Sequence, residues 1–308
     1  MLEAILISIA TAATPLFLAA IGELVAERAG VLNLGVEGMM AMGAVTGFAV
    51  ALATGSPMLG ALAAIVVGAL FSQLFAFLTL SLASNQVATG LALTLLGLGV
   101  SGQIGEAYVG QPGVRMDPVF LGLDPIFWFS LVLLVAVAWF LFHSKAGLKV
   151  RAVGDSHVSA HALGLPVILI RYAAVAFGGA CAGLAGAYLS LVYTPQWVEA
   201  MTAGRGWIAL ALVVFASWRP VRVLLGAWLF GAITIGQLQV QAMSLSTISG
   251  LPAPFDTMIG ALKAVPSQFL SSLPYLATVI VLVLISQNRR LAMVNTPACL
   301  GQPFVPDR

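Results

Sequence analysis

The sequence has very little charge. Asp, Glu, Lys and Arg make up 8% of the 308 residues, whereas 60% of the residues are hydrophobic. Soluble domains carry about a quarter charged residues, so this composition excludes an ordinary soluble protein. The net charge is only +2 and the basic residues are scattered along the chain. No nucleic-acid partner is therefore predicted, because such partners require a basic stripe or patch.

Motifs for catalysis and metal binding are also missing. The chain has no G-x-x-x-x-G-K-[ST] loop to cradle nucleotide phosphates, no H-E-x-x-H and no G-x-S-x-G. We therefore predict no catalytic residue and no cofactor bound by this chain. His157 and His161 are four residues apart, as in metal-binding pairs, but no Cys, Asp or Glu completes a set on that face, so no metal site is predicted. Cys181 lies in an apolar run and Cys299 in the polar tail, which argues against a disulfide.

What the chain has instead is a series of apolar runs, each close to the roughly 20 residues that cross the hydrocarbon layer of a membrane. Backbone groups in that layer must be hydrogen-bonded within their own segment, and runs this long and uniformly apolar do not fit barrel strands. The predicted fold class is an all-α polytopic membrane protein, a bundle of about nine helices. The predicted spans lie near residues 4–22, 31–53, 58–81, 86–105, 126–143, 170–193, 206–218, 222–243 and 273–287.

The basic residues predict the orientation, because Lys and Arg stay preferentially on the cytoplasmic side. If the segment 144–170 is cytoplasmic, alternation of the spans gives an external N-terminus and a cytoplasmic C-terminus. Of the 13 basic residues, only Arg115, Arg205 and Lys263 are then outside. The inside set consists of Arg28, Lys145, Lys149, Arg151, Arg171, Arg219, Arg222, Arg289, Arg290 and Arg308.

Two spans have distinctive patterns. In "FGGACAGLAGAY", residues 177–188, Gly179 and Gly183 lie on one helix face, which predicts close helix packing. Between Arg205 and Arg219 there are only 13 residues, about 20 Å of helix, which is short for a crossing. Either Arg205 snorkels to the interface, or the helix is broken and the stretch before it continues at membrane depth.

A polar segment, "RAVGDSHVSAHALGLP" at residues 151–166, interrupts the apolar runs midway along the chain. The spacing of its apolar residues predicts a short surface helix. The predicted apolar face consists of Val158, Ala162 and Leu165. Asp155 or Ser156 can cap the start of this helix, and Gly164 can end it.

This segment resembles the coupling segment of ABC importer permeases, in the branch that handles branched-chain amino acids, simple sugars and nucleosides. That family has a basic-Ala-x-Gly-acidic opening, then small residues, then Gly-Ile or Gly-Leu. The matching residues are Arg151, Ala152, Gly154, Asp155, Ala160, Gly164 and Leu165. The chain departs from the pattern at Ser156-His157, where the family often has Asn-Pro, and at Ser159, where it has alanine. Two other stretches are similar to the family: "AERAGVLNLGVEGMMAMGA" at 26–44, of the nucleoside type, and "LPYLATVIVLVLIS" at 273–286.

The resemblance implies a single permease domain over residues 1–308, with a cytoplasmic coupling segment at 144–170 and a cytoplasmic tail at 288–308. It implies a cytoplasmic ABC ATPase, which uses ATP and Mg, as the partner of that segment. The residues expected to couple to the ATPase are Arg151, Gly154, Asp155, Ala160, Gly164 and Leu165. It also implies a second homologous permease in a heterodimer, an extracytoplasmic binding protein or lipoprotein, and the lipid of a bacterial inner membrane. Without the resemblance, an ordinary amphipathic loop helix on the membrane face explains the segment equally well.

Polar side chains inside the spans are candidates for the substrate pathway, because they are costly in lipid. These candidates are Asn33, Glu37, Asn85, Gln86, Thr89, Gln237 and Gln241. Asn33 and Glu37 share a helix face, and either bind substrate hydroxyls or ring nitrogens or pair with a neighbouring helix. The amides suit a neutral nucleoside or sugar, and suit equally well an interhelical hydrogen bond worth roughly 1 kcal/mol.

The predicted function is therefore the permease subunit of an ATP-driven importer, forming half of the pathway for a small neutral solute, with nucleosides as the first candidate. A simple sugar or a riboflavin-like vitamin is the alternative cargo. An ion-coupled secondary transporter is a further alternative, but it needs intramembrane acids or bases, and Glu37 is the only acid expected within the spans.

Overall fold

The computed structural model describes residues 2–242, 272–273, 276–277, 279–280, 283 and 295–305. Over these residues the protein is all-helical, and its only strand-like pairing is an isolated bridge between Phe120 and Leu123. The fold class predicted from the apolar runs is confirmed.

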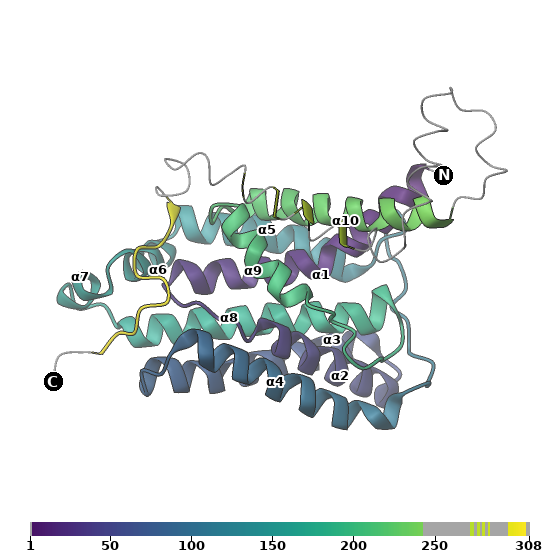
Figure 1. Cartoon of the computed structure of the whole chain (residues 1–308), viewed down its shortest axis with the longest axis horizontal. Coiled ribbons are helices and arrows are strands. Elements are labelled where there is room, and N and C mark those ends of the chain that lie inside the picture. The colour runs from purple at the N-terminus through teal and green to yellow at the C-terminus, as the bar shows by residue number, and fades with distance from the viewer. Residues whose placement is uncertain are drawn as a thin grey trace.

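Ten α-helices follow one another along the described part of the chain (Figure 1). Two of them, α3 and α8, continue into a π-helical turn, Phe77–Ser81 and Leu189–Tyr193. A 3₁₀ turn, Glu106–Tyr108, follows α4. The helices are α1 Leu2–Arg28, α2 Val36–Thr54, α3 Pro57–Ala76, α4 Gln86–Gly105, α5 Pro125–His143, α6 Lys145–Asp155, α7 His157–Ala162, α8 Val167–Tyr188, α9 Arg205–Phe215 and α10 Pro220–Ala242.

Several spans begin where the sequence offers a capping side chain. Ser56 accepts a hydrogen bond from the Leu59 amide at 3.5 Å, and Asp124 accepts one from the Phe127 amide at 2.9 Å. Asn85 caps α4 in the same way. Each cap satisfies one of the backbone donors that the first turn of a helix leaves unpaired.

Among the described residues, seven helices are long and apolar enough to cross a membrane. They correspond to seven of the nine predicted spans, and the predicted span 206–218 corresponds to α9, which has only 11 residues. The predicted span 273–287 falls almost entirely outside the described residues. The predicted end of the first span was wrong, because α1 does not stop near residue 22 but continues to Arg28.

Helix α8 lies at the centre of the bundle and packs along α1, α2 and α3. Small residues allow the backbones to come close: a Cβ on Gly183 would collide with the Ala64 carbonyl oxygen, and a Cβ on Gly179 would collide with Ser72. The two glycines predicted to serve packing therefore face α3. Their close approach fits the way in which small residues pack helices in lipid.

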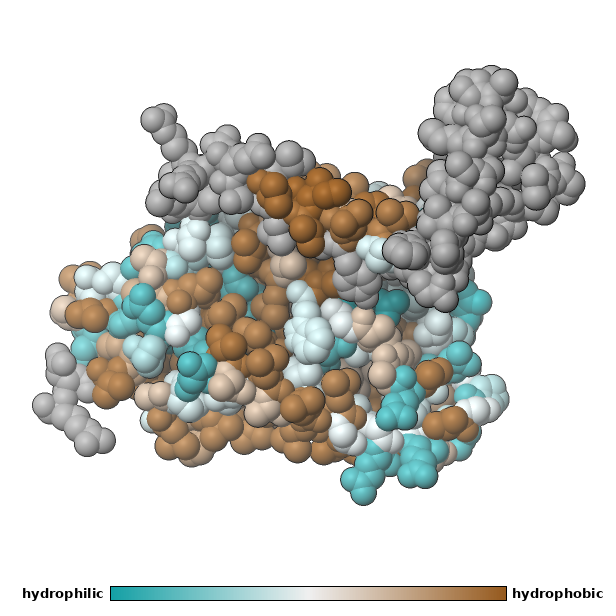
Figure 2. All heavy atoms as spheres, in the orientation of Figure 1, coloured by the Kyte–Doolittle hydropathy of each residue, from teal (hydrophilic) through white to brown (hydrophobic). Residues whose placement is uncertain are grey.

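Hydrophobic residues form broad patches on the face that Figure 2 shows, among them one along its lower edge. Large hydrophobic side chains on α3, α4, α5 and α10 are exposed, among them Leu70, Leu95, Val135 and Leu225. The N-terminus lies at the end of the bundle opposite α6 and α7, whereas the described tail, residues 295–305, lies beside those two helices (Figure 1). The apolar surface is what a multi-pass membrane protein presents to lipid.

Candidate functional site

The polar segment in the middle of the chain forms two short helices, α6 and α7, rather than one. Ser144 starts α6, its hydroxyl accepting a hydrogen bond from the Gly147 amide at 2.9 Å. Ser156 is extended, with φ −155°, and separates the two helices. Its hydroxyl accepts from the Ser159 amide at 3.2 Å and so caps α7, as one of the two predicted caps. Gly164, with φ +78°, follows the end of α7.

The face of α7 that packs on the protein is not the predicted one. His157 and Ala160 are buried, and Ala160 packs with Val153 of α6 and Val167 of α8. Val158 is 65% exposed and Leu163, just after α7, is 81% exposed. The expected apolar face of Val158, Ala162 and Leu165 is therefore wrong, because Val158 and Ala162 are exposed and Leu165 is only half-buried. Two large apolar side chains consequently project from this end of the bundle.

The six residues expected to couple to an ATPase divide into buried and exposed groups. Gly154 and Ala160 are buried, whereas Asp155 and Gly164 are exposed; Arg151 and Leu165 lie between these extremes. A Cβ on Gly154 would collide with the carbonyl oxygen of Arg28, at the end of α1. Gly154 therefore seats α6 against α1 and is not accessible to another protein.

A buried arginine joins α7 to the rest of the bundle. Arg171, near the start of α8, is 1% exposed. Its Nε donates to the Ala29 carbonyl at 3.1 Å, its Nη1 to the Gln302 carbonyl at 3.2 Å, and its Nη2 lies 3.2 Å from Nδ1 of His157. One guanidinium thus connects α8, the α1–α2 loop, α7 and the tail, a role that its sequence position as a flanking basic residue did not reveal.

The described tail completes the same assembly. The Cys299 amide donates to the Gly154 carbonyl at 2.9 Å, and the Gly301 amide donates to the Gly30 carbonyl at 3.2 Å. Phe304 packs edge-on against the ring of His157, with centroids 5.1 Å apart. Residues 295–305 are therefore bonded to α6, α7 and the α1–α2 loop together.

His157 is neutral in this setting. Burial, and then the positive charge of Arg171, lower the pKa of its imidazole below the ordinary value. Because a guanidinium can only donate hydrogen bonds, Nδ1 of His157 accepts and its proton resides on Nε2. Both histidines of the segment contact Phe304. In the described part of the chain, no three His, Cys, Asp or Glu side chains gather to hold a metal ion.

Glu37 binds the start of the short helix α9. Its Oε1 accepts from the Gly204 amide at 2.8 Å and its Oε2 from the Gly206 amide at 2.6 Å. Amides at a helix N-terminus lack partners within the helix and attract negative charge. The buried carboxylate therefore caps α9, and the chain before α9, residues 194–204, is not helical.

The other end of α9 is held by the end of α1. Ser217 and Trp218 have positive φ and follow the last turn. The Trp218 indole donates to Oε2 of Glu27 at 2.6 Å, and Nη2 of Arg28 donates to the Trp218 carbonyl at 2.9 Å. The stretch 26–44 thus binds α9 at both ends. Since Gly154 packs on the Arg28 carbonyl, a continuous series of contacts runs from α6 through Arg28 to α9.

Two candidates for the substrate pathway, Asn33 and Gln86, hydrogen-bond to the α1–α2 loop. The backbone amide of Asn33 donates to Oε1 of Glu23 at 3.0 Å. The side-chain Oδ1 of Asn33 accepts from the backbone amide of Gly35 at 2.9 Å. Oε1 of Gln86 accepts from the Leu32 amide at 2.8 Å. These polar groups supply the partners that a loop at membrane depth requires.

The remaining pathway candidates differ from one another. Asn85 caps α4, and the Thr89 hydroxyl lies 2.9 Å from that of Ser84. Oε1 of Gln237 is buried and, within the residues that the structure describes, has no hydrogen-bond partner. The side chain of Gln241 lies outside the described residues. Nε2 of Gln86 is likewise buried without a partner among the described residues, so two of the seven candidates, Gln86 and Gln237, have an uncommitted buried polar atom.

Comparison with known families fits this arrangement of membrane spans. Residues 5–285 match the family described as branched-chain amino acid transport system / permease component. The chain belongs to this permease family. The permease is accordingly a non-catalytic transport subunit of an ABC importer, a class in which an ATPase and a substrate-binding protein are separate subunits.

Its relatives cover almost the whole chain. The permease is 42% identical, over 95% of its length and 94% of the relative's, to a protein of Haloferax volcanii provisionally named a glucose ABC transporter permease. It is 30% identical to a guanosine ABC transporter permease of Bacillus subtilis, over 95% and 93% of the two chains. It is 32% identical to a nucleoside ABC transporter permease of Lactococcus lactis, over 88% of each. No solved structure matches the chain significantly.

The buried acids of the permease correct one expectation. Glu37 is not the only acid within the spans, because Glu23 and Glu27 of α1 are buried as well. The sequence window that ended the first span at residue 22 excluded both. Each of the three carboxylates accepts a hydrogen bond from the protein, from a backbone amide or from Trp218. They act as internal partners for a broken helix and a buried loop.

Proposed function

We propose that the permease forms half of the translocation pathway for a small neutral solute that carries a sugar ring, either a nucleoside or a simple sugar. The names of its relatives support both cargoes, and the relative with the higher identity is the one named for glucose. Neutrality is supported by Glu37, because both of its carboxylate oxygens are taken up by backbone amides at the start of α9. The hydroxyls common to both cargoes suit uncharged amide partners such as Gln237.

The coupling surface in this proposal consists of Val158 and Leu163, with the exposed Asp155 and Gly164 beside them. An ATPase that covers these apolar side chains buries surface that is otherwise exposed. Movement of α7 and α6 passes to α1 at the contact between Gly154 and Arg28, and from Arg28 to Trp218 at the end of α9. That series of contacts is the observation that carries the proposal, because it connects a surface segment to a broken helix inside the bundle.

The proposed orientation places α6, α7 and residues 295–305 in the cytoplasm and the N-terminus outside, in a plasma membrane. It follows from the positive-inside rule, since Arg28, Lys145, Lys149 and Arg151 lie at the same end as the tail. The proposed assembly contains a second, homologous permease, an ABC ATPase on the cytoplasmic side of α7, and an external binding protein or lipoprotein.

Two measurements test these proposals separately. The first is uptake of radiolabelled guanosine, adenosine, glucose, ribose and riboflavin by cells that express the whole transporter. Saturable, ATP-dependent uptake of a nucleoside or a sugar is expected. Uptake of riboflavin alone, or of none of the five solutes, refutes the cargo proposal.

The second measurement is ATPase co-purification with Leu163→Asp. The new carboxylate would be buried without a partner in an apolar interface, so roughly a tenfold or greater loss of binding is expected, which corresponds to about 1.4 kcal/mol. Val119→Asp, at a valine that is also strongly exposed but lies outside residues 144–170, is the matched control and should co-purify normally. Equal co-purification by both variants refutes the assigned surface.

A further inference from the structure

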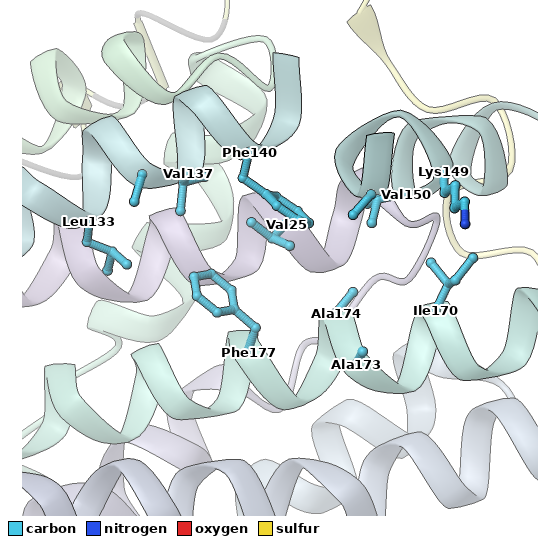
Figure 3. Close-up of a pocket in the computed structure, with 12 residues that line it drawn as sticks. Val25, Leu133, Val137, Phe140, Lys149, Val150, Ile170, Ala173, Ala174 and Phe177 are labelled. Carbon is cyan, nitrogen blue, oxygen red and sulfur yellow. The ribbon is translucent and has the colours of Figure 1, made fainter. Parts of the chain in front are cut away.

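An apolar cavity lies between α1, α5, α6 and α8, beside the coupling helices (Figure 3). Its volume is about 390 Å³, within the roughly 300–1,000 Å³ range of ligand pockets. Among the described residues that line it, Lys149 of α6 is the only one with a polar side chain. The others are aliphatic or aromatic and come from all four helices.

The cavity extends inward from the level at which the chain becomes polar. Figure 3 shows Lys149 above Ile170 at one end and Leu133 toward the other. On α5 the lining runs from Leu133 to Phe140, about 10 Å along the helix axis. Helix α5 ends at His143 and α6 begins at Lys145, so the ammonium group lies at the membrane interface and the rest of the cavity lies at hydrocarbon depth.

Water does not suit this space. A buried water needs about two to four polar partners, and the lining supplies only the ammonium group of a lysine. If this apolar space were empty, the side chains that line it would lose van der Waals contacts on that side. At this depth the abundant apolar molecule is a lipid acyl chain, which can enter because the cavity opens to the exterior between the helices.

The charge at the opening selects the headgroup. Lys149 is exposed, and no carboxylate belongs to the described lining. Basic residues between transmembrane helices on the cytoplasmic side attract acidic headgroups. We propose that this cavity binds one acyl chain of an acidic phospholipid, with the lipid phosphate beside Lys149. Since Ala146 and Val150 of α6 form one wall, the bound lipid also holds the position of the coupling helices.

The test uses the purified full-length permease in mixed micelles that contain equal amounts of phosphatidylglycerol and phosphatidylcholine with identical acyl chains. Native mass spectrometry counts the bound lipids of each kind. The wild-type protein is expected to retain phosphatidylglycerol in preference. Lys149→Gln should lower that preference about fivefold, because one lysine near the surface contributes about 1 kcal/mol.

Two further variants separate the charge from the cavity. Ala136→Phe and Ala173→Phe place rings in the cavity from exposed positions on α5 and α8, so the core stays intact, and both should lose bound lipid of either headgroup. Lys145→Gln removes the same charge from the same helix at a residue that does not line the cavity, and should behave as wild type. Equal effects of Lys145→Gln and Lys149→Gln, or full lipid retention by the two Phe variants, overturn the proposal.

Discussion

Glu37→Gln should destabilise the permease by releasing the start of α9. The carboxylate accepts from two backbone amides, that of Gly204, which is half-buried, and that of Gly206, which is buried. Gln retains one acceptor oxygen and places an NH₂ donor against the other amide. Leaving a buried donor unsatisfied costs about 1–3 kcal/mol, and losing a negative charge at a helix N-terminus adds about 0.3–1 kcal/mol.

A total of about 3 kcal/mol corresponds to a melting temperature lower by roughly 6–12 °C, at about 2–4 °C per kcal/mol for a large domain. The measurement is thermal unfolding of the purified protein in detergent, followed by tryptophan fluorescence. Glu106→Gln is the matched control, since Glu106 is exposed beyond the end of α4 and should shift the melting temperature by less than about 2 °C.

Uptake assays distinguish two roles for Glu37: holding the start of α9 in place, or binding the substrate. If Glu37 holds α9, a variant that still folds should transport more slowly without a change in its preference among solutes. If Glu37→Gln melts like the control and yet abolishes uptake, the carboxylate contacts the substrate and the assignment of Glu37 to the cap is refuted.

Three other perturbations follow from the coupling end of the bundle. Gly154→Val should lower the free energy of unfolding by roughly 1–3 kcal/mol, because the valine side chain collides with the end of α1. ATPase docking should weaken at the same time. Lost coupling at an unchanged melting temperature would contradict this. Trp218→Phe removes the donor to Glu27 and should cost about 1–3 kcal/mol in thermal unfolding, and a melting temperature equal to wild type would argue against that bond. His157 has a lowered pKa in the folded protein, so its contribution to stability is present at high pH and is lost as the pH falls below the ordinary histidine value of about 6.5. Hydrogen exchange of residues 295–305, corrected for its intrinsic pH dependence, should therefore be faster at pH 5.5 than at pH 7.5. The variant His157→Asn should remove this difference. Equal protection of the wild-type tail at both pH values would show that the tail does not depend on a neutral imidazole.

The spans could be predicted because the membrane imposes a length and an apolar composition on every crossing helix. The last turn of α1 could not. Glu23, Glu27 and Arg28 have the composition of a water-exposed helix end, but all three are buried, and Glu27 and Arg28 bond to a residue far along the chain. Trp218, the partner of Glu27, is 191 residues away. No local pattern contains that information.

The coupling segment illustrates the same limit. Its polar composition and its caps were visible in the sequence, and Ser156 does cap α7. Which face packs inward was not visible, because Val158 and Ala160 lie on opposite faces of a helix of only six residues and each face has apolar residues. The choice is made by Val167 and Phe304, which cover Ala160 and its neighbours. In the same way, Glu37 was recognisable as a costly residue, but only α9 defines its role.

The three-way bonding of Arg171 has a consequence for biosynthesis. Its partner Gln302 is 131 residues further along the chain, so at roughly 5–20 residues per second the ribosome adds that carbonyl several seconds or more after the guanidinium has been made. During that interval α7 lacks the covering of Phe304, and the arginine has an unfilled donor. The end of the bundle that contains α7 is therefore completed only once translation has passed Phe304.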